Sequence, residues 1–274
     1  MRALALMAAV VAVAGFANGY WGVGELFCLE GPRDGAMGGA TSVPLFLPEA
    51  AHANPAGLGF AGGLHLTSSY SLRFGTLRFY SLAAAGRGWG GRVISLDAGE
   101  LGPDPSYTAY GVVLSTGLAL GDVLAVGLAW KGFFQATPGE AFGWALDPAV
   151  LLRFGGVHLG LVLENAASAP IDYGGHREPW PWGIRGGVSL SGEIGGTAVT
   201  LAANARYTAS ASLDFGVGME VQRGIWSLRL GYGSGGLAAG ASLELGGYGV
   251  HWAIVLHPYL PSTVSVGASW GSGG

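Results

Sequence analysis

The sequence predicts an all-β protein: a transmembrane, antiparallel, up-and-down β-barrel of about 14 strands with an N-terminal hatch, or plug. Three observations lead to this prediction. Charged residues make up 11% of the 274 residues, against about 25% in soluble domains, and half of the chain is apolar. Apolar residues alternate with small or polar ones over most of the chain, which is the period of a β-strand. The chain also begins with a stretch typical of a secretory signal.

The N-terminal stretch, residues 1–19, is predicted to be a signal peptide. Arg2 supplies the positive start, residues 3–16 form the apolar run, and small residues near Ala17 and Gly19 offer cleavage sites. The alternative is an uncleaved membrane anchor, but the run is short for a helical span of about 20 residues. We expect an exported chain with a hatch at 20–60 and a barrel at 61–272.

The hatch is predicted because residues 31–58 are rich in Gly, Ala and Pro and have neither the period of a helix nor the alternation of a strand. Its glycines can take positive φ and allow close backbone approach. Asn54-Pro55 favours a turn, because Pro fixes φ and Asn can bond its own backbone. Such a segment is either a static plug or a gate.

Fourteen candidate strands follow the hatch. They are centred near His65, Phe79, Val93, Val112, Val126, Val150, Leu161, Val188, Leu201, Val217, Leu228, Ala241, Ile254 and Val266. A tilted spanning strand needs about 9–11 residues, so the loops are expected to be short. The stretch 108–130 has one charge and could form a membrane helix, but Gly121-Asp122 at its middle favours a hairpin.

Alternation alone fits two folds. A soluble sandwich points its apolar face inward, whereas a membrane barrel points it at lipid. Trp and Tyr occur near the strand ends on the apolar face, and the other face is poor in Lys. We therefore predict a barrel, with the polar face lining its lumen. Inward positions such as Gly160 are expected to tolerate a small side chain.

Ten charged side chains are predicted to point into the lumen. They are Arg78, Asp147, Arg153, Glu164, Arg185, Arg206, Asp214, Glu220, Arg229 and Glu244. The five arginines balance the five acids, whereas the pore of a wide porin is lined by an excess of charges of one sign. The set is predicted to form a structural network that braces barrel and hatch. The alternative is a polar path for a ligand.

Two motifs match patterns for cofactor binding or catalysis, but neither has the structural context that its chemistry needs. Gly231-x-Gly233-x-x-Gly236 matches a dinucleotide fingerprint, but the residues after it alternate like a strand. The range 267–271 matches a nucleophile elbow, but no helix can follow it. There is one cysteine, Cys28, and no metal-ligand spacing. We predict no enzyme activity, catalytic residue, metal or cofactor. Without a basic cluster, nucleic acid is not an expected partner.

The hatch carries a family resemblance. Gly31, Arg33 and 37–40 (MGGA), followed by 54–58 (NPAGL), resemble the N-terminal hatch of outer-membrane barrels related to FadL and PorV/PorQ. In place of an acidic pair often found in mid-hatch, this chain has Phe46-Leu47. The resemblance implies a 14-stranded barrel in the outer membrane of a Gram-negative-type bacterium. Its outer-membrane lipid is then an expected partner.

The resemblance also implies a function. FadL-like proteins pass hydrophobic small molecules across the outer membrane through a plugged barrel. The alternative is PorV-like binding of secreted cargo proteins in type IX-like secretion. Short loops offer little surface for a large partner, which favours transport. A set of hatch residues is predicted to contact the ligand or gate its passage: Gly35, Met37, Gly38, Gly39, Asn54, Pro55 and Ala56.

Overall fold

The computed structural model describes residues 24–27, 31–40, 42–43, 48–99, 107–137, 139–209 and 213–272. The predicted signal peptide lies outside the described residues, as do Cys28 and Phe46-Leu47. Within these ranges, four short helical elements precede the strands: α2 (Gly24–Phe27), α3 (Pro32–Ala36), α4 (Ala50–Ala53) and the 3-10 helix η1 (Pro55–Phe60). Among the described residues, no helix has the length and apolar character needed to cross a membrane.

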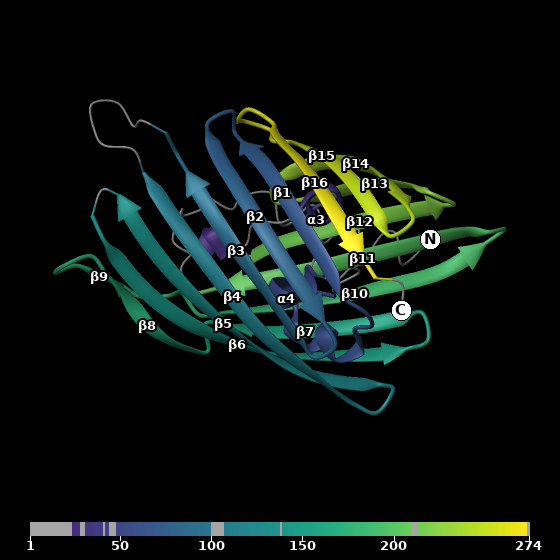
Figure 1. Ribbon diagram of the computed structural model, residues 1–274, viewed down its shortest axis with the longest axis horizontal. Helices are drawn as coiled ribbons and strands as arrows, with labels where there is room; N and C mark the ends of the chain where they lie inside the picture. The colour runs from purple at the N-terminus through teal and green to yellow at the C-terminus, as the bar shows by residue number, and fades with distance from the viewer. Residues whose placement is uncertain are drawn as a thin grey trace.

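Sixteen strands follow (Figure 1). The first eight are β1 (His65–Arg73), β2 (Leu77–Gly86), β3 (Trp89–Asp97), β4 (Thr108–Leu120), β5 (Leu124–Thr137), β6 (Ala141–Phe154), β7 (Val157–Glu164) and β8 (Ala167–Asp172). The others are β9 (Arg177–Glu178), β10 (Gly183–Ile194), β11 (Thr197–Thr208), β12 (Leu213–Arg223), β13 (Trp226–Gly233), β14 (Gly236–Leu245), β15 (Tyr248–Leu256) and β16 (Thr263–Gly271).

Fourteen of the strands close into an antiparallel barrel. Each pairs with its neighbour along the chain, β1 pairs with β16, and β7 pairs with β10, while β8 and β9 form a side hairpin on β6. All fourteen predicted strand centres lie in barrel strands. The hairpin predicted in 108–130 is β4–β5, with Leu120 paired to Leu124. The predicted fold class is confirmed.

The two ends of the barrel differ. At one end, the turn end, strands are joined by two or three residues, as at 87–88 and 246–247. At the other, the loop end, the connections include 98–107, 165–182 and 257–262. The expectation of short loops therefore holds throughout the turn end, and at the loop end it fails for these three connections. Bacterial barrels place short turns in the periplasm and longer loops outside the cell.

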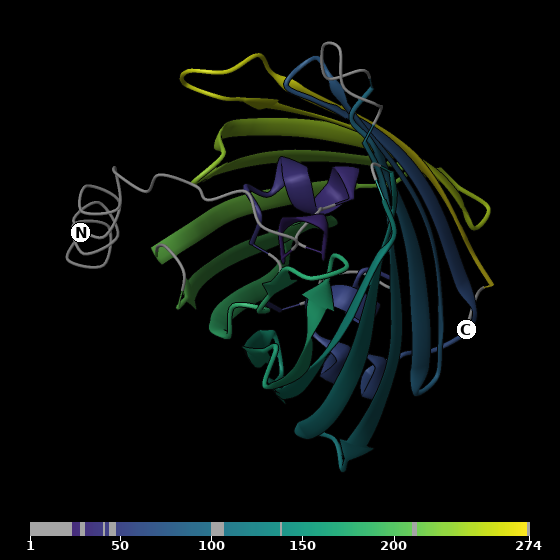
Figure 2. The same cartoon turned by 90° about the vertical axis from the view of Figure 1, so that its left-hand side faces the viewer.

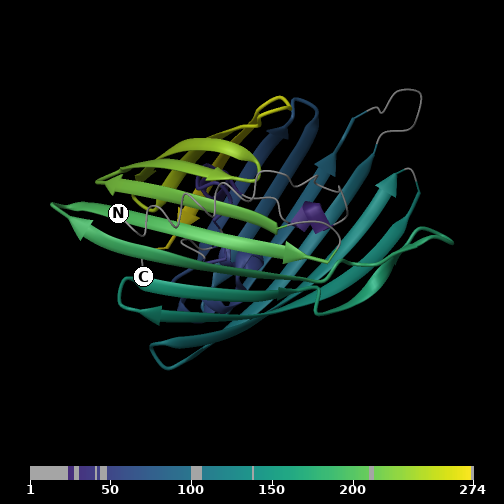
Figure 3. The same cartoon turned by 180° about the vertical axis from the view of Figure 1, so that it is seen from behind.

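The outer face of the wall is apolar. Side chains that point outward are largely exposed, including Leu82, Leu118 and Leu228. Exposed aromatic side chains lie near both ends of the strands, as in the aromatic girdles of membrane barrels. Those near the loop end are Tyr80, Tyr110, Phe134, Phe142, Trp182 and Tyr207, and those near the turn end are Trp89, Phe154, Trp226 and Tyr248. Figure 3 shows the wall from the side of β10–β12.

Candidate functional site

The lumen is filled by an interior segment, which we define as residues 31–40, 42–43 and 48–60. Figure 2 looks into the barrel and shows the short helices of this segment enclosed by the strands. Helix α3 packs on β13–β16, whereas α4 and η1 pack on β2–β6. Met37, Ala56 and Leu58 are at most 1% exposed. The segment therefore forms the core that the wall closes around.

The wall approaches the interior segment through glycines. Gly216, Gly218 and Gly231 face the backbone of residues 37–39, and Gly127 faces Pro55-Ala56. A Cβ on any of these four glycines would overlap backbone atoms of the segment. Gly160 is in the same position against the carbonyl of Ser42, so the tolerance expected for a side chain at Gly160 is wrong. The dinucleotide-like glycines 231 and 233 have this packing role.

The predicted hatch residues anchor the segment. Asn54 is fully buried; its Nδ2 donates to the carbonyl oxygens of Ser42 (2.9 Å) and Val150 (3.2 Å), and its Oδ1 accepts from the Ala56 N–H (3.1 Å). Pro55 begins η1 directly after this cap. Gly38 (φ +68°) lies against the backbone of Tyr232, where no side chain fits.

Gly35 and Gly39 complete the predicted hatch set. The Gly35 N–H donates to the Gly31 carbonyl inside α3 (2.9 Å). The Gly39 carbonyl accepts from Nδ2 of Asn204 on β11 (2.8 Å). The seven predicted hatch residues therefore lie in two groups, at α3 and at the α4–η1 junction, and those groups contact different parts of the wall.

One charged network crosses β12–β16. The Arg229 guanidinium is 2% exposed, pairs with Glu220 and donates to Ser242 Oγ (2.5 Å). Ser242 Oγ lies 2.7 Å from His251 Nδ1, and His251 Nε2 lies 2.7 Å from Ser269 Oγ. Arg33 of α3 pairs with Glu244 at 3.5 Å. This network fixes α3 to one side of the wall.

A second network lies on β5–β7 and β10–β12. Glu164 pairs with Arg185 (3.3 Å) and with Arg206 (2.6 Å), and Arg206 lies 3.8 Å from Asp214. Arg185 also donates from Nη2 to the Ala53 carbonyl at the end of α4 (2.7 Å).

Two further charged side chains of the predicted set lie on β6, Asp147 beside this second network and Arg153 near the turn end. Asp147 pairs with Lys131 at 2.7 Å. Arg153 lies with its guanidinium carbon 4.1 Å from the Phe60 ring centroid. A brace between barrel and hatch remains a prediction, and the contacts that bear on it are Arg33–Glu244 and Arg185 to the Ala53 carbonyl.

Nine of the ten predicted inward charges point into the barrel, and Arg78 does not. Arg78 shares the outer face with Tyr80 and Leu82, is about half exposed, and lies 3.7 Å from Asp97 at the loop end. The prediction fails because the inner face of β2 carries Phe79 at this level. Because the inner face is apolar here and the outer face carries the charge, a prediction based on polarity exchanges the two faces.

Two inward cations were not predicted. Arg92 and Lys131 are 5% and 8% exposed and point into the lumen from β3 and β5. The row of small residues Ala125, Gly127 and Ala129 precedes Lys131 on its face and could have revealed its direction. On β5 both faces are apolar or small around Lys131, and on β3 the outer face carries the polar Ser95 and Asp97, so polarity hid the phase of the alternation.

His52 lies in the interior segment, near Arg92 and Arg185. Burial lowers the pKa of His52 well below its usual value, and the positive charges of Arg92 and Arg185 lower it further. The imidazole is therefore neutral at physiological pH. Within the described part of the chain, no three His, Cys, Asp or Glu residues are grouped as a metal site.

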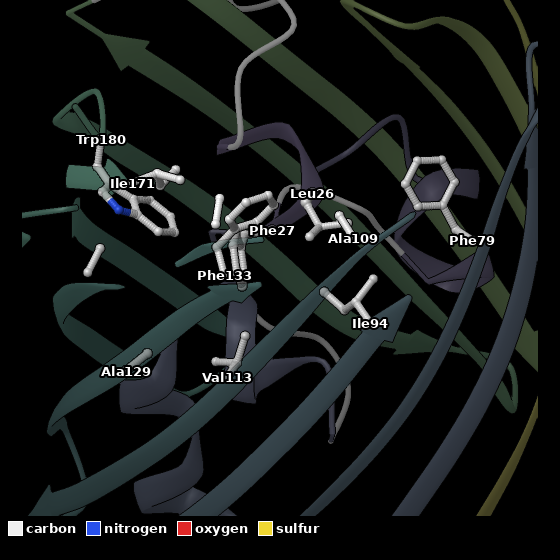
Figure 4. Packing of buried hydrophobic residues seen from close by; sticks show 12 residues of the cluster. Leu26, Phe27, Phe79, Ile94, Ala109, Val113, Ala129, Phe133, Ile171 and Trp180 are labelled. Carbon is white, nitrogen blue, oxygen red and sulfur yellow. The ribbon is translucent and has the colours of Figure 1, made fainter. Parts of the chain in front are cut away.

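A cluster of buried apolar side chains packs together at the loop end of the lumen (Figure 4), and we call this packed region the chamber. Its wall residues come from β2–β6, β8 and residues 179–182, and its members are buried. They are Phe79, Ile94, Ala109, Val113, Ala129, Phe133, Ala141, Ala145, Ile171 and Trp180, together with Leu26 and Phe27 of α2. The sequence could not reveal this chamber, because apolar residues on inward positions look the same as lipid-facing ones.

The wall beside the chamber has a seam. Beyond Glu164 the chain turns at Asn165 (φ +56°), and β8 pairs with β6 and β9 and, within the described chain, not with β10. Residues 179–182 (PWPW) follow β9 and lead into β10. Trp180 lies inside the chamber, and Trp182 lies outside, 51% exposed, against the Tyr207 ring. The Asn165 Nδ2 holds the segment by donating to the Pro181 carbonyl (2.6 Å).

Comparisons with known proteins agree with this architecture. Neither family models nor curated protein sequences gave a match. Among solved structures, the monoaromatic hydrocarbon channel CymD is 12% identical, with 89% of this chain and 98% of that chain covered and a TM-score of 0.59. The Pseudomonas putida toluene transporter TodX is 12% identical over the same shares, with a TM-score of 0.58.

A Pseudomonas aeruginosa FadL homologue is 10% identical, with 86% of this chain and 97% of that chain covered and a TM-score of 0.53. The chain has a FadL-like barrel fold. At such identities the likeness establishes the fold and leaves the ligand to be argued from the chamber.

Proposed function

We propose that this FadL-like barrel passes hydrophobic small molecules across the outer membrane of a Gram-negative-type bacterium. The observation that carries the proposal is the apolar chamber at the loop end, inside a closed wall. Pockets for small ligands are mostly apolar and hold a few placed polar groups. The chamber has this composition, with the Lys131–Asp147 ion pair at its edge. We infer that the barrel has no enzyme activity.

The location follows from the outer face. Exposed apolar side chains between two aromatic girdles suit lipid and not water. A barrel satisfies its backbone hydrogen bonds in its own ladder, which lets it span a membrane. Export by the predicted signal peptide would deliver the chain to the outer membrane. Fold neighbours described as hydrocarbon channels and toluene transporters support the same placement.

The route proposed here starts at the chamber. The interior segment fills the lumen below it, so passage needs a part that can move. The glycine contacts and buried ion pairs hold the interior segment, whereas Leu26, Phe27 and Trp180 enter the chamber as side chains. The backbone of residues 181–182 is held at its carbonyls by Asn165 and Ala209. We infer that the side chains of α2 and Trp180 move first. A gating role for the predicted hatch residues is proposed to follow, through movement at Asn54 and Gly38-Gly39.

The test is uptake of long-chain and aromatic hydrophobic compounds by cells that lack their own transporter. Ile94→Asn places an amide in the chamber, and we expect uptake at least tenfold below the wild type. Val93→Thr, on the lipid face of the same strand, is the matched control and should leave uptake unchanged. Heat-modifiability on gels verifies that each barrel is assembled.

The opposite outcomes are informative. Wild-type uptake equal to that of an empty vector would refute transport. The PorV-like role then remains, and it predicts unchanged uptake together with loss of surface display of secreted proteins when the chain is deleted. The loops 165–182 and 257–262 would be the surface for such cargo.

A further inference from the structure

The ring of Phe27 occupies a defined seat in the chamber. Its centroid lies 5.5 Å from that of Trp180, with the ring planes at 44° (Figure 4). Gly111 of β4 makes room for it, because a Cβ there would come within 3.0–3.1 Å of the Phe27 ring. Gly143 does the same for Ile171 and Trp180 behind the seat. The wall is therefore shaped around an aromatic ring.

A cation lies beside this seat. Lys131 Nζ is 5.8 Å from the Phe27 ring centroid and 5.6 Å from that of Trp180, within the range of cation–π attraction. Its ion pair with Asp147 is almost buried, with side chains 10% and 5% exposed. A buried cation needs a partner, and Asp147 supplies one while the rest of the ammonium faces the two rings.

The ring in the seat belongs to a short element with few contacts among the described residues. Helix α2 has four residues, and the described interactions of Phe27 are apolar and ring contacts. The interior segment, in contrast, is tied to the wall by backbone contacts at glycines and by Asn54 and Arg185. Leaving the seat therefore requires no break in the buried ion pairs.

We propose that Phe27 is a resident stand-in for the ligand, that its seat binds an aromatic ring, and that Lys131 makes the seat selective for aromatic over saturated ligands. This inference rests on the transport function proposed above. An aromatic face is electron-rich and attracts an ammonium, most strongly where water is excluded. A saturated ring of the same size fills the same volume but gains nothing from Lys131. Selectivity thus depends on charge and not on shape alone.

The test compares toluene with methylcyclohexane in the full-length chain, using uptake by cells that lack their own transporter. The wild type should take up toluene at least tenfold faster than methylcyclohexane, each corrected for an empty vector. Lys131→Met with Asp147→Asn removes the charges while Asn keeps an acceptor for the Asn165 N–H, which Asp147 now accepts at 2.7 Å. In this double variant the preference should fall to about twofold. Lys131→Arg keeps the cation and should keep the preference.

A second variant tests the stand-in. Phe27→Ala empties the seat, so an aromatic ligand no longer competes with an internal ring. Toluene uptake at low concentration should then rise severalfold, with heat-modifiability unchanged. If Phe27 is only packing, the variant leaves toluene uptake unchanged or lowers it.

The outcomes separate the two proposals. Uptake of both compounds at equal rates by the wild type, or an unchanged preference in the double variant, would overturn the role of Lys131 and leave transport standing. Uptake of neither compound above the empty vector would overturn the transport function itself. Failure of the double variant to assemble shifts the comparison to Lys131→Arg and Phe27→Ala, in which an unchanged toluene uptake for Phe27→Ala overturns the inference.

Discussion

The interior segment and the chamber lie in one lumen but are held in different ways. The interior segment contacts the wall backbone to backbone, through glycines and through buried charges such as Arg229 and Arg185. The chamber includes side chains of α2 and Trp180, beside a seam where β8 has, within the described chain, no ladder pairing to β10. Backbone contacts leave no room for adjustment, whereas side chains can change rotamer. We infer from this difference that the interior segment is fixed and that the chamber beside it can open.

The largest expected effect is at a buried ion pair of the fixed region. Arg229→Met would leave Glu220, 5% exposed, without its partner, and breaking a buried pair costs about 3–5 kcal/mol. Arg177→Met at the loop end, where both partners are exposed and screened by solvent, should have a much smaller effect. Urea unfolding in lipid vesicles measures both. Equal losses would contradict the contrast between the regions.

A single substitution made in both regions sharpens the comparison. Gly231→Ala would put a Cβ into the backbone of residues 37–38, and overpacking of this kind costs about 1–3 kcal/mol. Gly111→Ala meets only the Phe27 and Leu26 side chains, which can shift, so we expect a loss below about 1 kcal/mol. Gly186→Ala is the control, because Gly186 is on the outer face and a Cβ there would meet its neighbours only at ordinary van der Waals distance. The reverse ranking in urea unfolding would make the interior segment the looser region.

Asn54→Ala tests whether the interior segment also gates the passage of the ligand. It removes the cap of η1 and two bonds to carbonyls, and loss of such a cap costs about 0.5–2 kcal/mol. We expect intact heat-modifiability, because the strand ladder closes on itself, and altered uptake of long-chain hydrophobic compounds. Uptake identical to the wild type would confine gating to α2 and residues 179–182.

The smallest expected effect is at the side hairpin. The Gly174 N–H (2.9 Å) and then Arg177 (3.3 Å) hold the pKa of Asp172 below its usual value. A depressed carboxyl pKa stabilises the hairpin above the unfolded value of about 4, and this is lost as pH falls through the folded pKa. Hydrogen exchange at residues 172–178 should rise at acid pH in the wild type. Asp172→Asn should abolish this pH dependence, and a persistent one would assign it to another group.

The sequence determined the wall. A period of two along residues 65–271, with few charges, is enough to predict fourteen strands and the two faces of most of them, since every barrel strand must present one face to lipid and one to the lumen. Alternation also predicted the inward direction of nine of the ten charges, and the family resemblance singled out Asn54 and Gly38. These residues differ from their surroundings in polarity or in backbone freedom, and such differences can be read locally.

Only the tertiary structure decided what fills the lumen. Leu26, Phe27, Ile94 and Trp180 come from distant parts of the chain and form one chamber, and their apolar character alone cannot tell inside from outside. For the same reason Arg78 was placed on the wrong face and Lys131 was missed. The role of the wall glycines was also hidden, because a glycine shows that a backbone can approach but not which one does. Inward and lipid-facing apolar residues have the same chemistry, so only closure of the barrel around the N-terminal segment distinguishes them.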